Sequence, residues 1–521
     1  MTDPLGAPRL GRALAPALGF WVALLAVGAG CRPRSSGYDA GPAPEDSGRL
    51  PLTPVALPEL HCTPPASPAP DSECVRDGDC GGGARCVLDR GRELSDRAPI
   101  ALRCGDALGD RGRRARCDSP SDCASGLCTL SGICVAPCGE QGDCALGEAC
   151  QAVEIRLSDD ALSPLSVCVR SVAVLPEATV EHVGRSDALS PNSVWEARFP
   201  IRDRNALLYL KTQCDREVQV QQVVTSDNLY LFNIGALFSG KPALNPVVNG
   251  GALLPVQIPN NPILPDLDGD YIFSVVVNGT TPLDRVAIWQ TGSRSVLDLN
   301  VFYVGGGAFL VDGGFRPGSP QVQELMARLD RAYRLWGLRL GTIREYDVVG
   351  ALRDEFGVLE ASLTDGTDGP ADLVIPRLGD LFALSAGVDD GGLNLFLLED
   401  MGDVLGISGG IPGSLGVHGT PASGVALAVD VVGLTASVNV LMHEMSHQMG
   451  LLHTTEIDGF VMEPLGDTPE CGAEYDESGD GILSADECID HGAENLMFWA
   501  GVGSQLSPLQ VEVLKASVAL R

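Results

Sequence analysis

The motif His443-Glu-Met-Ser-His447-Gln-Met-Gly450-Leu-Leu-His453 reads H-E-x-x-H-x-x-G-x-x-H. Residues four apart share one face of a helix, so His443 and His447 can present their imidazoles to one point. Gly450 can take the left-handed conformation that ends a helix, and the turn brings His453 back as a third ligand. Three neutral nitrogens leave a fourth position on Zn²⁺ open for water. We therefore predict a catalytic zinc site, with Glu444 beside its water; the alternative is a surface helix that carries exposed histidines.

The chain has seven histidines, and three of them fall in this motif. The motif resembles that of the metzincin family of zinc endopeptidases. The resemblance implies that His443, His447 and His453 bind zinc, and that Glu444 is the general base that deprotonates the zinc-bound water. The residues that follow, from Thr454 onward, look most like the pappalysin-type branch of that family.

The resemblance also implies a methionine in a tight turn beneath the metal. Asn495-Leu-Met497 lies well downstream of the motif, so Met497 is the candidate, and a plain core methionine is the alternative. Some members of the family place a tyrosine two residues further on, to help the transition state. Trp499 stands at that position here, so a phenolic donor is absent from it.

Residues 293–521 are expected to form an α+β, metzincin-like catalytic domain. Ser319 caps and Pro320 opens a helix with apolar residues at helical spacing, which we expect to run to Trp336. In the family an edge strand above the cleft pairs with extended substrate. Leu393–Glu399 and the glycine-rich Gly406–Gly413 are the candidates for that wall, and an ordinary core strand is the alternative for Leu393–Glu399.

The chain has 521 residues and a net charge of −32, which argues against nucleic acid as a partner. Residues 1–31 resemble a secretory signal: arginines precede an apolar run that ends in small residues before Cys31. We predict that Cys31 is lipidated as in bacterial lipoproteins; ordinary cleavage or a retained anchor is the alternative. Residues 32–61 are rich in Pro, Ser, Gly and Ala and indicate a flexible linker. The protein is thus expected to be exported, as an outer-membrane or cell-surface lipoprotein or a secreted protein.

Seventeen cysteines also indicate an oxidising compartment. Residues 62–171 contain three Cys-rich modules of four cysteines each, and an aspartate precedes the second cysteine every time. We expect each module to be cross-linked internally, with connectivity left open, so that Cys62 and Cys214 are left over and could pair with each other. Zinc binding by these cysteines is the rival, although C-x₂-C spacing is absent. Residues 172–292 show short β-rich runs between turns, which predict a β-sandwich of accessory or propeptide type.

An acidic loop lies between the histidine motif and Met497. It places oxygen ligands at the six positions of an EF-hand loop, with Gly481 at the sixth residue of the loop. The six predicted Ca²⁺ ligands are Asp476, Ser478, Asp480, Ile482 (by its backbone), Ser484 and Glu487. A solvated acidic loop is the alternative. Cys471 and Cys488 bracket the loop and are expected to pair, and we predict that Ca²⁺ and this disulfide together order the segment that carries Met497.

The chain is therefore expected to be a multidomain protein: Cys-rich modules, a β-sandwich-like domain and a C-terminal zinc endopeptidase domain acting on protein or peptide substrates. Zn²⁺ and Ca²⁺ are the expected cofactors, and contact with a membrane is expected only through the N-terminal lipid. The alternative is a cell-surface binding or adhesion protein with a vestigial or latent protease domain. Oligomeric state and peptide specificity do not follow from the sequence.

Overall fold

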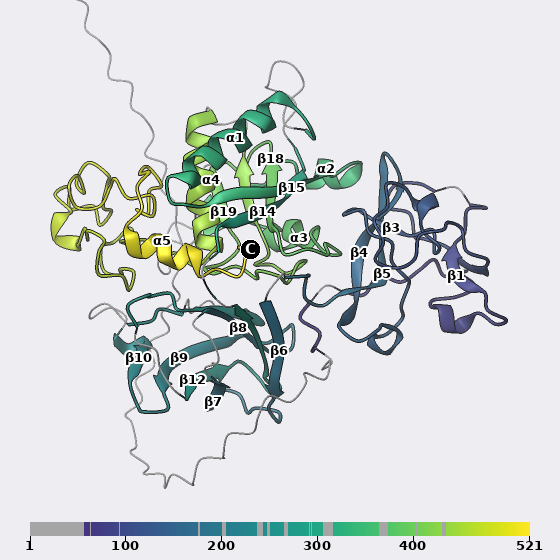
Figure 1. The fold of residues 1–521 in the computed structure, drawn as a ribbon, viewed down its shortest axis with the longest axis horizontal. Coiled ribbons are helices and arrows are strands. Elements are labelled where there is room, and N and C mark those ends of the chain that lie inside the picture. Colours follow the sequence, from purple (N-terminus) through teal and green to yellow (C-terminus); the bar gives the residue numbers. More distant parts are fainter. Residues whose placement is uncertain are drawn as a thin grey trace, which may run out of the picture.

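The computed structural model describes residues 57–521 except 63, 93, 176–177, 201–204, 237–242, 247–250, 265–268, 291, 293, 306–315, 364–372, 403 and 430–433. The predicted signal segment, Cys31 and most of the predicted linker lie outside the described residues. Within the described part, no helix combines the length and the apolar character that a membrane crossing requires. The chain forms several sheets with few helices, and Figure 1 shows three parts: the disulfide-rich modules, a pair of stacked sheets, and a sheet flanked by helices.

The disulfide-rich part holds short strands and single turns of 3-10 helix. Its strands are β1 (Arg85–Leu88), β2 (Leu102–Gly105), β3 (Cys128–Thr129), β4 (Glu148–Ser158) and β5 (Ala161–Arg170). β1 pairs with β2, and β3, β4 and β5 form a three-stranded antiparallel sheet. Such small units bury little surface, so cross-links contribute much of their stability.

All three modules have the same connectivity, first cysteine to third and second to fourth. The pairs are Cys74–Cys86, Cys80–Cys104, Cys117–Cys128, Cys123–Cys134, Cys138–Cys150 and Cys144–Cys168. The repeated aspartates have a shared role: each accepts two backbone N–H bonds at the start of a 3-10 turn, as Asp79 does from Val75 and Arg76. The prediction of internal disulfides is confirmed.

The second part is a sandwich of two four-stranded antiparallel sheets, in the orders β10-β9-β12-β7 and β11-β8-β13-β6. Its strands are β6 (Ala178–Arg185), β7 (Val194–Pro200), β8 (Asn205–Lys211), β9 (Val218–Thr225), β10 (Tyr230–Asn233), β11 (Leu253–Ile258), β12 (Asp270–Val277) and β13 (Asp284–Gln290). The strand β8 is buried along its whole length. Leu208 and Leu210 face the interior of the sandwich, and the alternate residues Leu207 and Tyr209 join the core of the third part.

The third part is built on a mixed sheet in the order β15-β14-β18-β20-β19. Its strands are β14 (Val296–Tyr303), β15 (Arg339–Asp347), β18 (Leu393–Leu398), β19 (Gly406–Ser408) and β20 (Val425–Ala428), with a separate small pair formed by β16 (Ser362–Leu363) and β17 (Leu373–Val374). The first four strands of that order are parallel, and only the edge strand β19 is antiparallel to its neighbour.

The helices are α1 (Pro320–Arg334), α2 (Ala351–Phe356), α3 (Leu378–Ala383), α4 (Leu434–Gln448) and α5 (Pro508–Lys515). Ser319 caps α1 as expected, by accepting from the N–H of Val322. The helix ends at Arg334, two residues earlier than predicted, because the chain turns before Gly337, whose φ is +74°.

The two segments predicted to form the wall of the cleft occupy different positions in the sheet. β18 lies in the middle of the mixed sheet with all six residues buried, so the proposal of Leu393–Glu399 as an edge strand is wrong and the core-strand alternative holds. A run of consecutive apolar residues is typical of a strand covered on both faces. The glycine-rich segment, by contrast, begins with the edge strand β19.

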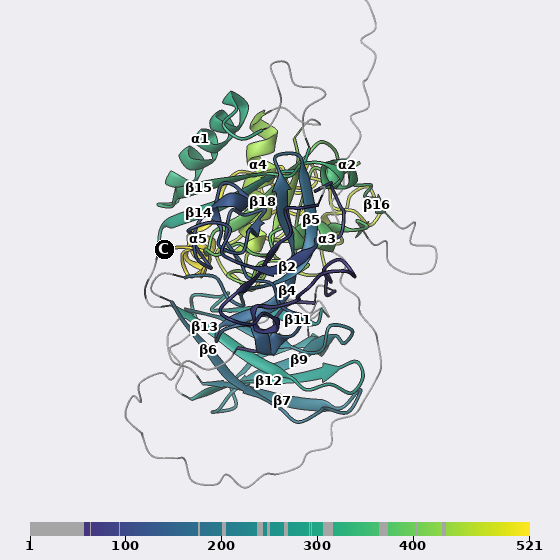
Figure 2. The ribbon, with the colours of Figure 1, turned by 90° about the vertical axis from the view of Figure 1, so that its right-hand side faces the viewer.

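The sandwich lies next to the mixed-sheet part (Figure 2), and residues of both belong to one hydrophobic core. The hydroxyl of Tyr209 donates to the carbonyl of Leu415 at 2.6 Å, and Gln290 donates to the carbonyl of Leu520 at 2.8 Å. In addition, Cys62 pairs with Cys214 across 152 residues, as predicted. Removing the sandwich would therefore expose core residues of the part that carries the histidine motif.

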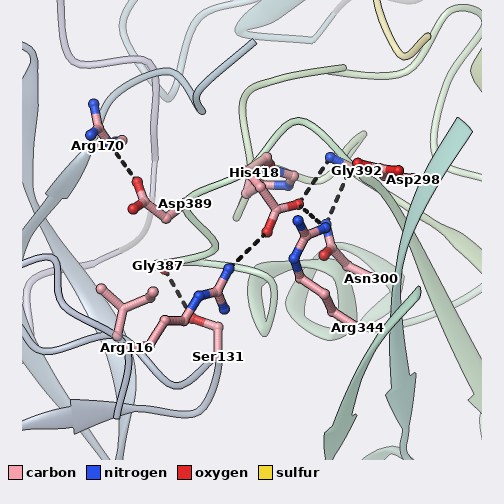
Figure 3. A network of polar contacts seen from close by, with 12 residues as sticks. Arg116, Ser131, Arg170, Asp298, Asn300, Arg344, Gly387, Asp389, Gly392 and His418 are labelled. Carbon is pink, nitrogen blue, oxygen red and sulfur yellow. Dashed lines mark hydrogen bonds and ion pairs between the residues drawn. The ribbon is translucent and has the colours of Figure 1, made fainter. Parts of the chain in front are cut away.

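The modules dock on the mixed-sheet part through a polar network around Asp389 and Asp390 (Figure 3). Asp390 accepts from Arg344 on β15 at 3.1 Å and from Arg116 of the modules at 3.4 Å, and its carbonyl lies 2.6 Å from Nε2 of His418. Arg170 pairs with Asp389. The network adds to an apolar contact, in which Leu130 and Leu162 of the modules are buried in a core cluster of the mixed-sheet part.

We expect Asp390→Asn to lower the free energy of unfolding by about 1–2 kcal/mol, because two guanidinium groups lose a charged partner. Denaturant unfolding followed by circular dichroism measures this. The matched control is Glu196→Gln, whose exposed pair with Arg198 should contribute within about 0.5 kcal/mol. Equal effects of the two changes would show that Asp390 does not hold the modules in place.

Candidate metal centre

The helix α4 carries the first two histidines of the motif. It contacts α1, β19 and β20, and its residues Leu441 and Met445 are fully buried in the shared core. The spacing of four places His443 and His447 on the same face, as the sequence predicted.

Gly450 makes the turn that returns the chain to the site. Its φ is +104°, and a Cβ there would lie 2.9 Å from the carboxamide oxygen of Gln257 on β11 of the sandwich. Both the conformation and the close approach require glycine. The turn brings His453 to the other two histidines, and all three are at least 97% buried.

The three Nε2 atoms converge. They lie 3.0 Å apart for His443 and His447, 3.0 Å for His447 and His453, and 3.3 Å for His443 and His453. Each Nδ1 has an acceptor: the carbonyl of Leu496 for His443, the carbonyl of Leu451 for His447 and the carboxylate of Glu456 for His453, at 2.7–2.9 Å. Each Nδ1 therefore carries the proton, and each Nε2 presents a lone pair.

Three lone pairs that face one another within 3.3 Å repel unless a cation lies among them. The centre of this triangle is about 1.8 Å from each nitrogen, close to the usual zinc–imidazole distance of about 2.0–2.1 Å, so these three nitrogens could hold a zinc ion. Burial lowers the pKa of His443 to about 3, and it lowers the pKa of His447 well below the ordinary value. Both imidazoles are therefore neutral, as metal binding requires.

Glu456 makes the pKa of the third histidine, His453, differ from those of the other two. Burial acts to lower the pKa of His453, but the neighbouring Glu456 carboxylate outweighs it and leaves that pKa above the ordinary value. Carboxylate–histidine pairs of this kind are typical of metal ligands, because the carboxylate fixes the ring and makes Nε2 a stronger donor of electrons.

Glu444 lies in the same buried space, with 6% of its surface exposed. Burial raises its pKa to about 7, although His453 and the backbone N–H of Ser408 act to lower it. The edge strand β19 lies directly against it: a Cβ at Gly406 would be 3.0 Å from Cγ of Glu444 and 2.5 Å from Val440. The glycine thus allows the strand to approach the helix at the position of the carboxylate.

Met497 lies next to the histidines in a tight turn. The N–H of Phe498 donates to the carbonyl of Asn495 at 3.1 Å, and Leu496, which accepts from His443, lies inside the turn. Met497 is fully buried, and its carbonyl accepts from the N–H of Thr454, immediately after the third histidine. The structure therefore brings the predicted methionine and the motif together.

The acidic loop folds around its own carboxylates. Glu487 accepts from the N–H groups of Ser478 and Ser484 at 2.9 and 2.8 Å, and Asp476 accepts from those of Gly479 and Gly481. These bonds, first those from Ser484, lower the pKa of Glu487 to about 2, so the carboxylate stays ionised at neutral pH. The donor set is one that suits Ca²⁺, a hard cation that prefers oxygen.

The loop is tied to both sides of the histidine site. The N–H of Leu483 donates to the carbonyl of Ile457, which lies four residues after His453. The carbonyl of Leu483 accepts from the indole N–H of Trp499 at 2.7 Å. Cys471 pairs with Cys488, as predicted, within the same small hydrophobic cluster. The Trp499 side chain is thus used in packing.

The chain matches none of the protein-family models and none of the curated proteins with which it was compared. Among solved structures it is similar in part to an active site mutant of a family two carbohydrate esterase from Clostridium thermocellum, at 10% identity and a TM-score of 0.12. The match covers 42% of this chain and 65% of the esterase, which is less than two thirds of that protein. A similarity this low carries no argument about fold or function.

The sequence did not predict the groups that orient the three histidines. Glu456 was a detectable signal, because it is a carboxylate three residues after a predicted ligand. The carbonyls of Leu451 and Leu496 have no side-chain signature, and Gln257 lies in a different part of the chain. The sulfur atoms that cluster in each module belong to its disulfides. The sixteen cysteines from Cys62 to Cys488 are all paired, so none of them is a free thiol.

We expect Glu456→Ala to lower zinc affinity by about 10–100-fold, because His453 loses the acceptor that orients it. Competition with a chromophoric chelator measures the affinity. Glu512→Ala, which removes an exposed carboxylate on α5, is the control and should leave it unchanged. An unchanged affinity in Glu456→Ala would mean that the carboxylate does not support a metal ligand.

Proposed function

We propose that the chain is a zinc-dependent endopeptidase of the metzincin type. The observation that carries the proposal is the convergence of three Nε2 atoms within 3.3 Å, beside the buried carboxylate of Glu444. This donor set leaves room for water and substrate at the ion. The Met497 turn against the histidines and the antiparallel edge strand beside Glu444 support the same proposal.

Zinc, when bound, lowers the pKa of water and polarises the carbonyl of the scissile bond. Glu444 takes a proton from the attacking water and passes it to the leaving amine. Its buried position supports this role, because burial raises its proton affinity toward the range of a general base that works near neutral pH. Trp499 offers no phenolic donor, and its indole N–H is already bonded to Leu483.

The alternatives are a latent enzyme and a binding or adhesion protein with a vestigial site. The intact Glu444 argues against a vestigial site, because binding alone has no need of a buried carboxylate there. The shared core of the sandwich and the mixed-sheet part argues against a removable propeptide. Val461, in the segment after His453, is itself part of the core of the sandwich.

We further propose that the loop 476–487 binds Ca²⁺ through Asp476, Ser478, Asp480, the Ile482 carbonyl, Ser484 and Glu487. The bonds of Leu483 to Ile457 and Trp499 connect this loop to the segments that carry His453 and Met497. Ordering the loop therefore orders both segments. The paired cysteines fit an exported protein, and lipidation of Cys31 remains a prediction.

We expect Glu444→Gln to retain one zinc per chain but to lose proteolysis by at least about 10²-fold, because the variant keeps the three nitrogens and lacks the base. Metal analysis and cleavage of a denatured protein substrate are measured side by side on the full chain. Glu512→Gln is the control and should cleave like the parent. Turnover by Glu444→Gln would refute the assignment of the base, and absence of zinc from the parent would refute the proposal as a whole.

We expect removal of Ca²⁺, with zinc retained, to lower both the melting temperature and the rate of proteolysis. Glu487→Gln should abolish this calcium response, because the residue supplies the bidentate ligand of the loop pattern. Asp486→Asn is the matched control, since Asp486 is an exposed carboxylate of the same loop at a position without a ligand role. A parent protein that responds to neither chelation nor added Ca²⁺ would overturn the calcium proposal.

A further inference from the structure

A cavity of about 250 Å³ lies where the sandwich meets the segment that follows β19. One wall is residues 251–255, at the start of β11. The other wall is residues 409–412 and 420–422, and the Cys62–Cys214 disulfide contributes to the lining. The described residues that line the cavity are mostly apolar, and none of them is charged.

The edge strand β19 leads directly to this cavity. The carbonyl of Leu405 accepts from Ala428, and the N–H of Gly409 donates to Gly424. Because hydrogen-bonded pairs alternate along an antiparallel ladder, Ile407 bonds to β20, while the backbone groups of Gly406 and Ser408 point away from it. The backbone groups of Gly406 and the carbonyl of Ser408 are ones to which an added strand can bond, whereas the N–H of Ser408 faces Glu444.

The same segment is fastened to the helix that carries the histidines. Gln448, which follows His447, lies 2.8 Å from the hydroxyl of Ser408 and donates to the carbonyl of Ala422 at 2.8 Å. A Cβ at Gly413 would overlap the Gln448 carboxamide. The free edge beside Glu444 and the wall of the cavity are therefore parts of one fixed surface.

We propose that this cavity is a substrate subsite, which binds a large apolar side chain of a peptide strand paired with β19. The proposal rests on the proposed endopeptidase function and adds its substrate class. A strand that follows β19 past Ser408 reaches Gly409 and Gly410, which belong to the cavity wall. In strand addition the main-chain bonds supply affinity, and a pocket for a side chain supplies specificity.

The size of the cavity fits an aromatic or long aliphatic side chain, since an apolar cavity of about 150 Å³ already holds benzene. Its lack of charged groups selects against acidic and basic side chains, which would lose their hydration without a partner. The sandwich supplies one wall, so it takes part in substrate selection in addition to its structural role.

The test is the variant Ala252→Trp, which fills the cavity from the sandwich side, where the Ala252 side chain is only half-buried. The matched control is Val194→Trp on β7, where the side chain is 65% exposed. Cleavage sites selected by the parent from a peptide library should show Phe, Leu or a similar residue at one fixed position. For peptides with that residue, kcat/KM of Ala252→Trp should fall by about 10-fold or more, and for matched peptides with alanine there it should stay unchanged.

Other outcomes separate this proposal from the proposed function. Cleavage by the parent with no apolar preference, or an equal loss on both peptides in Ala252→Trp, would overturn the subsite and leave the endopeptidase in place. A rise in cleavage of all peptides in Ala252→Trp would show that a segment of the chain itself fills the cavity, and it would also overturn the subsite.

If the parent cleaves nothing, the endopeptidase proposal fails, and the subsite proposal is then tested by measuring peptide binding. Calorimetry on the Glu444→Gln chain would then compare alanine decapeptides with and without a single phenylalanine. Binding that requires phenylalanine and is lost when Ala252→Trp is added supports the subsite. Equal binding of the two peptides overturns it.

Discussion

The Nδ1 hydrogen bonds of the three histidines are the interactions on which the site depends. An imidazole can point its Nε2 lone pair at a metal only when its proton is held on the other nitrogen. The acceptor for His443 is a backbone carbonyl 53 residues downstream, and the acceptor for His453 is a carboxylate three residues away. The motif supplies the three imidazoles, but the rest of the chain decides whether they converge.

Successive layers of structure hold those acceptors. The turn that offers the Leu496 carbonyl is fixed by Asn495, whose side chain bonds to Gln510 on α5. The indole of Trp499 fixes the next residues to the acidic loop. On the other side, Gln257 of the sandwich donates to the carbonyl of Val513 on α5 and lies against Gly450. Residues from the sandwich, the acidic loop and the last helix therefore support three imidazoles.

The sequence predicted what depends on local spacing. The histidine cluster, the Ser319 cap, the internal pairing of the modules and the Cys471–Cys488 disulfide follow from offsets along the chain. The Cys62–Cys214 pair follows from counting, because these two cysteines are left over. Features set by three-dimensional neighbours did not follow. Residues 393–398 could not be assigned to the core or the edge, because burial on both faces depends on the elements that cover the sheet. The connectivity within modules had three alternatives each, and only the fold selects one.

The Cys62–Cys214 disulfide bears on what happens if the chain is nicked. It joins the start of the modules to the turn between β8 and β9, so the chain from Cys62 to Cys214 forms a covalently closed loop. A single break in that loop leaves both fragments attached through the disulfide, and whatever holds the N-terminus still holds the histidine site. Reduction of this bond, together with a break, would be needed to release it. In an environment rich in proteases, the cross-link acts as a second tether that runs in parallel with the backbone.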